Sequence, residues 1–176
     1  MFNLLFDETL DLINCWPLKH HYLYENQYRN DLLEYLRKKF DEQNPFSSQR
    51  KISIRKEDGS GLCDIAIDER TIGIEMKMDL VLKEDADKLS GQLLNYKKQY
   101  NDLIVVLVGM IDDQAFEYLE QQIYGLQNDN PMNQQRIRII KKEHLTEVNE
   151  QLVQNEKEET FIERYNRMIR EKRFHI

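Results

Sequence analysis

The chain has 176 residues, with 25 Lys and Arg against 32 Asp and Glu, which gives a formal net charge of −7. This length fits one compact domain, so we expect residues 1–176 to fold as a single domain. A content of 40% hydrophobic residues, with plentiful Tyr and Phe, argues against disorder of the whole chain. The acidic balance argues against bulk electrostatic binding of nucleic acid, which is typical of basic domains.

The start of the chain carries no targeting signal that we can identify. Residues 1–16 lack a basic beginning and hold acidic residues inside their apolar run, unlike a signal peptide or a membrane anchor. The longest apolar stretch, residues 103–111, is too short to span a bilayer as a helix. Cys15 and Cys63 are then best interpreted as reduced packing residues. We expect a cytoplasmic protein without membrane contact.

Two helices are predicted before the first strand. Residues 3–14 form a short amphipathic pattern that Pro17 stops, and residues 22–40 repeat apolar side chains at helical spacing. From Lys51 the period changes from 3.6 to 2. The alternation predicts a three-stranded meander, with strands at 51–56, 64–67 and 72–77.

The second half of the chain alternates helices and strands. A charged helix at about 85–100 precedes an apolar strand at 103–109, which we expect to be buried on both faces and covered by helices on both sides. The later elements are a helix at 113–126 capped by Asp112 or Asp113 and ended at Gly125, a loop at 128–134, a strand at 136–140 and a charged helical pattern at 143–173. This order predicts a mixed α/β sandwich.

A cluster of charged residues lies on the predicted hairpin. If its turn comprises residues 68–71, Ile67 pairs with Ile72 and Asp64 lies opposite Glu75, while Lys77 shares the face of Glu75. Opposed carboxylates repel unless a hard cation lies between them, and Mg²⁺ prefers oxygen ligands. The pattern therefore indicates a magnesium site with a lysine beside it. The alternative is a solvated face on which Lys77 neutralises one acid.

The neighbouring helices add candidate residues. Lys88, Gln92 and Tyr96 are spaced by four residues and line one helix face. Glu25 points along the apolar stripe of the earlier helix, where an acid needs a partner. The alternatives remain open: Glu25 complements its helix dipole, and Gln92 and Tyr96 are ordinary interface polar groups.

Together these residues resemble the motif of the PD-(D/E)XK nuclease superfamily, including the Gln-x-x-x-Tyr helix of its RecB-like branch. The matching residues are Glu25, Asp64, Glu75-Met76-Lys77 and Gln92 to Tyr96. The resemblance covers about residues 22–108 and departs at Cys63, which stands where the family name gives Pro. It implies an α/β, restriction-endonuclease-like αβββαβ core with a mixed central sheet flanked by helices. That core would span about 20–142, with an added N-terminal helix at 1–16 and a charged helical segment at 143–176.

The resemblance implies a Mg²⁺-dependent deoxyribonuclease, expected to be an endonuclease, with Mn²⁺ able to substitute for Mg²⁺. Asp64 and Glu75 would hold one or two ions, with the Met76 carbonyl as a further ligand and Glu25 contributing directly or through water. Lys77 would activate the attacking water, and Gln92 would support Lys77 or the scissile phosphate. Asp64, Glu75, Lys77, Glu25 and Gln92 are thus the expected catalytic set.

DNA is the expected partner, with RNA as the alternative. Residues 160–176 carry a local charge of +3 beside −10 for the rest of the chain. The expected nucleic-acid contacts are Lys88, Tyr96, Arg164, Arg167 and Arg170. We favour a homodimer, since superfamily members often cut both strands of a duplex with two sites. The alternative function is a catalytically inactive module of the same fold, which binds nucleic acid or another protein.

Overall fold

The computed structural model describes residues 4–43, 52–57, 59, 61–128 and 135–142. The chain divides into two compact units, Met1–Leu145 and Thr146–Ile176. All of the described helices and strands belong to the first unit. The helix predicted at 143–173 lies outside the described residues. No described helix is long and apolar enough to cross a membrane.

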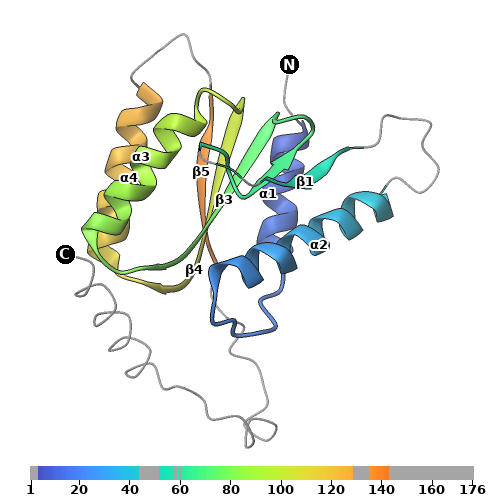
Figure 1. Ribbon diagram of the computed structural model, residues 1–176, viewed down its shortest axis with the longest axis horizontal. Helices are drawn as coiled ribbons and strands as arrows, with labels where there is room; N and C mark the ends of the chain where they lie inside the picture. Colours follow the sequence, from blue (N-terminus) through green and yellow to red (C-terminus); the bar gives the residue numbers. More distant parts are fainter. Residues whose placement is uncertain (1–3, 44–51, 58, 60, 129–134, 143–176) are drawn as a thin grey trace, which may run out of the picture. The chain divides into compact units, whose positions relative to one another are not determined.

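The described elements follow the predicted chain order, from the first helix to the last strand (Figure 1). They are α1 (Leu4–Cys15), α2 (Glu25–Gln43), β1 (Ile54–Lys56), β2 (Ile65–Ile67), β3 (Ile72–Leu80), α3 (Lys83–Tyr96), β4 (Asp102–Ile111), α4 (Asp113–Asn128) and β5 (Ile137–Lys142). The fold class is therefore α/β, as the sequence predicts.

The strands form one mixed, open sheet in the order β1-β2-β3-β4-β5. The first three strands pair antiparallel and confirm the predicted meander, whereas β3, β4 and β5 pair in parallel. Ile67 pairs with Ile72 and Ile65 pairs with Ile74, so the turn between β2 and β3 has the four residues expected. This register sets the relative positions of the site residues.

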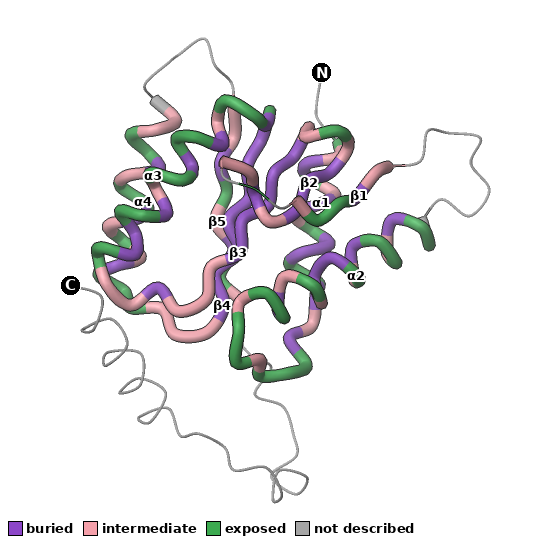
Figure 2. The backbone as a smooth tube through the Cα atoms, in the orientation of Figure 1, coloured by how far each residue is buried: buried purple, intermediate pink, exposed green. Residues whose placement is uncertain are grey.

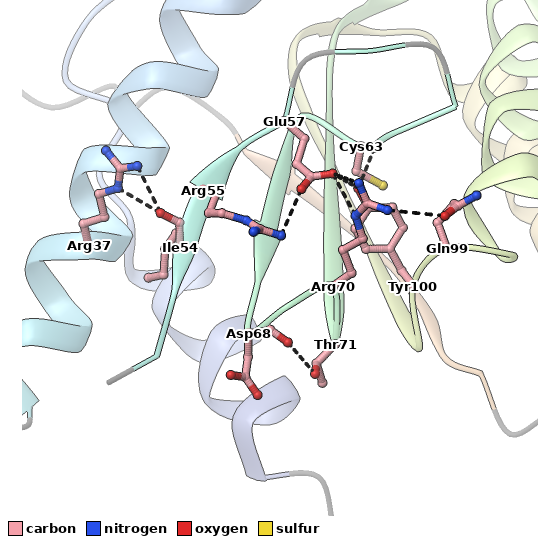
Figure 3. Close-up of polar contacts among 10 residues, drawn as sticks. All are labelled: Arg37, Ile54, Arg55, Glu57, Cys63, Asp68, Arg70, Thr71, Gln99 and Tyr100. Atoms are coloured by element: carbon pink, nitrogen blue, oxygen red, sulfur yellow. Dashed lines mark hydrogen bonds and ion pairs between the residues drawn. The ribbon is translucent and has the colours of Figure 1, made fainter. Parts of the chain in front are cut away.

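The turn itself holds its conformation without glycine. Asp68, Glu69 and Arg70 all have positive φ angles, of 50°, 54° and 71°. The carbonyl of Asp68 accepts hydrogen bonds from both the amide and the hydroxyl of Thr71, at 3.0 and 2.7 Å (Figure 3). The Asp68 amide in turn donates to Ser53 at 2.8 Å, which ties the turn to the chain just before β1. These bonds offset the strain of three left-handed residues in sequence.

Helices cover both faces of the sheet, as Figure 1 shows. Ile104, Val106 and Val108 of β4 pack in a core cluster with α1 and α2, whereas Leu103 and Val105 belong to a second cluster with α3 and α4. The alternation follows from the two-residue period of a strand. Burial on both faces is thus confirmed for β4, and Figure 2 shows the buried residues gathered on β3 and β4. The burial of each such apolar side chain stabilises the folded state by roughly 1.5–3 kcal/mol.

Several boundaries differ from the prediction. Helix α2 begins at Glu25, three residues later than expected, because Gln27 Oε1 accepts a hydrogen bond from the amide of Tyr24 at 3.2 Å and caps the helix there. Helix α3 ends at Tyr96, and residues 97–99 form a turn. The prediction that Cys15 is a packing residue is wrong, since Cys15 is exposed, whereas Cys63 is buried as expected.

Helix α4 also ends differently. The cap is Asp112, whose Oδ1 accepts a hydrogen bond from the amide of Ala115 at 3.0 Å. The predicted end at Gly125 is wrong, because Gly125 does not have the positive φ of a terminating glycine and the helix continues to Asn128. Gln127 holds the last turn by donating to the carbonyl of Ile137 at 2.9 Å.

Candidate active site

Asp64 and Glu75 lie next to each other where β2 begins. Ile65 pairs with Ile74, and one further step in this register places Asp64 opposite Glu75. The amide of Met76 donates a hydrogen bond to Asp64 Oδ2 at 2.8 Å. The Asp64 carboxylate is therefore fixed against the strand that carries Glu75 and Lys77.

Glu25 approaches the same place from the first residue of α2. Its Oε2 atom accepts a hydrogen bond from the amide of Met78 at 2.8 Å and lies 3.6 Å from Lys77 Nζ. The position of Glu25 follows from the late start of α2, which places this residue at the N-terminal end of the helix. Of the residues predicted from sequence, the structure thus brings Glu25, Asp64, Glu75 and Lys77 together.

The edge of β3 explains why two carboxylates meet there. Strand β2 pairs with β3 only as far as Ile74, so beyond that residue β3 has no antiparallel neighbour among the described residues. The amides of Met76 and Met78 donate to Asp64 and Glu25 instead. In a strand, the carbonyl of a residue points to the same edge as its amide. The Met76 carbonyl therefore faces the edge where the carboxylates lie, as its predicted role requires.

A β-bulge follows directly. The register of β3 and β4 shifts between Met78 and Leu80, where Asp79 has a φ angle of 57° and Gly109 one of 82°. Asp79 Oδ1 accepts a hydrogen bond from the amide of Met110 at 2.7 Å and so stabilises the irregular pairing. The bulge therefore lies immediately after Lys77 and Met78, before the last residue of β3.

Glu75 is a buried acid. The residue is only 8% exposed, and its Oε1 atom accepts a hydrogen bond from the Tyr96 hydroxyl at 3.4 Å. Burial, reinforced by the negative charges of Asp64 and Glu25, raises the pKa of Glu75 from 4.5 to about 8, although hydrogen bonds from Tyr96 and the Asp64 backbone act in the opposite direction. Metal-free Glu75 is thus largely protonated at neutral pH.

Arg29 is a member of the site that the sequence interpretation missed. Its Nη1 atom lies 3.3 Å from Asp64 Oδ1, and both side chains are mostly buried. A signal for it was present, because Arg29 lies four residues after Glu25 and so shares one face of α2 with it. The sequence indicated acids and a lysine, but a second cation beside Asp64 was not expected.

Other predicted residues lie elsewhere or outside the described chain. Gln92 is exposed on α3, and within the described residues no hydrogen bond or ion pair joins it to the carboxylates, whereas Tyr96 reaches Glu75. Lys88 is also exposed on this helix. The predicted contacts of the basic tail, Arg164, Arg167 and Arg170, fall outside the described residues.

The carboxylates of the site are candidate ligands for a divalent cation. In the described part of the chain, no group of three His, Cys, Asp or Glu side chains has an arrangement that could hold a metal ion. Asp64 uses one oxygen for Arg29 and the other for the Met76 amide, but a carboxylate oxygen has two lone pairs. Carboxylate and carbonyl oxygens are the ligands Mg²⁺ prefers. Burial raises the pKa of Glu75 most, and the negative charges of Asp64 and Glu25, which a cation would offset, raise it further. The chemistry of the donors fits Mg²⁺, and a bound ion would compete with Arg29 for Asp64.

Comparisons of the chain with family models, with curated proteins and with solved structures gave no match.

Proposed function

We propose that this protein is a metal-dependent nuclease that hydrolyses phosphodiester bonds of DNA and belongs to the PD-(D/E)XK type. The observation that carries the proposal is the convergence of Glu25, Asp64, Glu75 and Lys77 from three separate segments on one open strand edge. The order of elements around them supports a restriction-endonuclease-like core, because α2, the meander, α3 and β4 follow as αβββαβ.

The carboxylates would provide the metal site of this enzyme. Asp64 and Glu75 would hold Mg²⁺ or Mn²⁺ together with the Met76 carbonyl, with Glu25 contributing through a water molecule, and the ion would supply Lewis acidity toward the phosphate. Because Glu75 binds a proton with a pKa of about 8, it must release that proton when it becomes a ligand. Tyr96 would keep the Glu75 carboxylate oriented by donating its hydroxyl proton.

Lys77 is the residue proposed to act on the attacking water. Its side chain is partly exposed, at 32%, and its Nζ atom lies 3.6 Å from Glu25 Oε2. From this position Lys77 would orient the water, and its charge would stabilise the negative charge that develops on the phosphoryl oxygens. Arg29 would act indirectly, by fixing Asp64 from the side of α2.

The proposal is tested by incubating the purified chain with single-stranded and double-stranded DNA, and with RNA, in the presence of Mg²⁺ or Mn²⁺. We expect metal-dependent cleavage that EDTA stops and that a folded Asp64→Ala variant lacks. Unchanged cleavage by this variant would contradict the assignment. The substrate that is cut fastest identifies the natural class of nucleic acid and separates DNA from RNA.

A second candidate is a catalytically inactive module of the same fold, which binds nucleic acid or protein. The contacts that favour it are the ion pairs from Arg29 to Asp64 and from Lys77 to Glu25, which give the carboxylates internal counter-charges. Calorimetric titration with Mn²⁺ distinguishes the two functions. A nuclease binds the ion through Asp64 and Glu75, whereas the module retains its ion pairs and gives no binding heat.

A further inference from the structure

A second polar cluster lies beside the candidate active site. It consists of Glu57, Arg55, Arg70, Tyr100 and Cys63, and we call it the Glu57 cluster (Figure 3). Glu57 is only 7% exposed at its side chain, yet the two arginines flank it, with Arg55 at 3.2 Å and Arg70 at 3.0 Å. A buried carboxylate with this many partners has a fixed orientation.

The chain at Asp64 needs such support, because Asp64 lies outside both strand pairings of β2. The carbonyl of Asp64 accepts a hydrogen bond from the Glu57 amide at 3.0 Å, and the amide of Cys63 donates to the Tyr100 hydroxyl at 3.1 Å. The peptide that joins Cys63 to Asp64 is therefore held from both ends, by the main chain of Glu57 and by the side chain of Tyr100.

The Tyr100 hydroxyl connects these two supports. It donates its proton to Glu57 Oε2 at 3.1 Å, which leaves its lone pairs for the amide of Cys63. Burial, together with the neighbouring Cys63 and Glu57, raises the pKa of Tyr100, so the hydroxyl keeps the proton it donates. Cys63, the residue directly before Asp64, is thereby anchored to the segment that follows α3.

Gly73 fixes the Tyr100 ring against β3. A Cβ atom at Gly73 would come within 2.7 Å of Cys63 Sγ and 2.8 Å of Tyr100 Cγ, so the absence of a side chain permits both contacts. Gly73 lies two residues before Glu75 on the same strand. The ring of Tyr100 thus relates the segment of Asp64 to the strand that carries Glu75.

We propose that Tyr100 is a positioning residue: it holds the Asp64 carboxylate in place for a divalent cation that Asp64 shares with Glu75. The Tyr100 hydroxyl does this by accepting the hydrogen bond of the Cys63 amide while it donates its own proton to Glu57. This inference rests on the proposed nuclease function and assigns to it a residue outside the nuclease motif. Tyr96 and Tyr100 then have parallel tasks: one hydroxyl bonds Glu75 directly, and the other holds the chain of Asp64. Tyr100 does not itself touch substrate or metal.

The test compares Tyr100→Phe with a matched control, Tyr118→Phe. Both changes remove a single hydroxyl, but the Tyr118 hydroxyl donates to Asp87 in an exposed contact between α4 and α3. Mn²⁺ affinity is measured by calorimetry, folding by circular dichroism, and exchange of the Cys63 amide by hydrogen–deuterium exchange in the metal-free chain. We expect Tyr100→Phe to weaken Mn²⁺ binding about tenfold and to speed exchange at Cys63, with Tyr118→Phe matching the wild type in both.

A structural role alone would lower the melting temperature of Tyr100→Phe and leave the Mn²⁺ affinity of the folded protein unchanged, which would overturn the inference. If Tyr100→Phe does not fold, Glu57→Gln takes its place in the test. This variant keeps an acceptor for the Tyr100 hydroxyl but loses the negative charge that orients that hydroxyl. Wild-type Mn²⁺ affinity in Glu57→Gln would also overturn the inference. A wild-type chain that binds no Mn²⁺ would overturn the proposed function and this inference together. Binding by the wild type with an unaffected Tyr100→Phe would overturn the inference alone.

Discussion

Glu25 and Met78 are 53 residues apart in sequence, yet Glu25 Oε2 accepts a 2.8 Å hydrogen bond from the Met78 amide. This contact joins the first turn of α2 to the end of β3 and places an acid within 3.6 Å of Lys77. The helix and the strand therefore contribute to one polar site, whose chemistry can be tested residue by residue.

Replacement of Lys77 should remove catalysis and leave the fold intact. Lys77 is partly exposed and its one described ion pair is with Glu25, so Lys77→Ala should cost little stability. If the lysine orients the attacking water, DNA cleavage with Mg²⁺ should fall by about 10²–10⁴-fold. The matched control is Lys38→Ala, which removes an exposed lysine of α2. Equal cleavage rates in the two variants would exclude a catalytic role for Lys77.

The stability of the metal-free protein should depend on the protonation of Glu75. Its pKa is about 8 in the folded chain against an ordinary 4.5, so the folded state binds this proton more tightly than the unfolded state does. The stabilisation that this proton gives the folded state is fully present below pH 4.5, declines as the pH rises from 4.5 to 8, and is lost above that range. At about 1.4 kcal/mol for each pKa unit, the decline is on the order of a few kcal/mol.

Urea denaturation at a series of pH values measures this decline, and Glu75→Gln is the reference because it has the same shape and does not titrate. We expect the unfolding free energy of the wild type to fall relative to that of Glu75→Gln as the pH rises across this range. A difference that stays constant from pH 4.5 to 8 would show that Glu75 titrates normally.

Addition of Mg²⁺ should raise the melting temperature, and more at pH 8 than at pH 6. The ion must displace the proton of Glu75, so its binding strengthens as the pH approaches about 8. An ion at a hundredfold excess over its dissociation constant stabilises the fold by about 2.7 kcal/mol. Differential scanning fluorimetry measures the shift. Asp64→Asn should abolish most of it, and a full shift in that variant would place the ion elsewhere.

Two glycines offer a paired test of packing near the site. A Cβ at Gly73 would lie 2.7 Å from Cys63 Sγ, so Gly73→Ala should destabilise the protein by about 1–3 kcal/mol. Gly91 lies inside α3 and nothing approaches its Cβ position within 4 Å, so Gly91→Ala should stabilise it by up to about 1 kcal/mol. Thermal unfolding of both variants checks the opposite signs. Equal effects would mean that Tyr100 and Cys63 can move away from β3 at little cost.

The period of the sequence was sufficient to predict the sheet around the site. Alternating residues predicted the meander, and the assumption of a four-residue turn gave the register that sets Asp64 beside Glu75. These predictions succeed because a period of two determines which side chains share a face, and a shift by one residue would bury the charged face.

Other features depend on contacts between distant segments, which periodicity does not record. The salt bridge from Arg29 to Asp64 spans 35 residues, and the bulge at Asp79 relies on a left-handed residue that is not glycine. Gln92 shares its helical spacing with Tyr96, yet Tyr96 is buried and bonds to Glu75, whereas Gln92 is exposed to solvent. The helix end predicted at Gly125 was wrong because it relied on the tendency of glycine to adopt a left-handed conformation after a helix, whereas here the helix continues.

On the β2 side of β3, no described strand pairs with the residues beyond Ile74, which has a consequence for how inactive variants should be made. An unpaired strand edge is a template for the addition of another chain, and here Asp64 and Glu25 occupy the amides of Met76 and Met78. Truncation of both acids to alanine would leave these two donors without their acceptors at the strand edge and invite self-association. Amide replacements, such as Asp64→Asn and Glu25→Gln, keep an acceptor for each donor, so they should yield monodisperse protein where the double alanine variant aggregates.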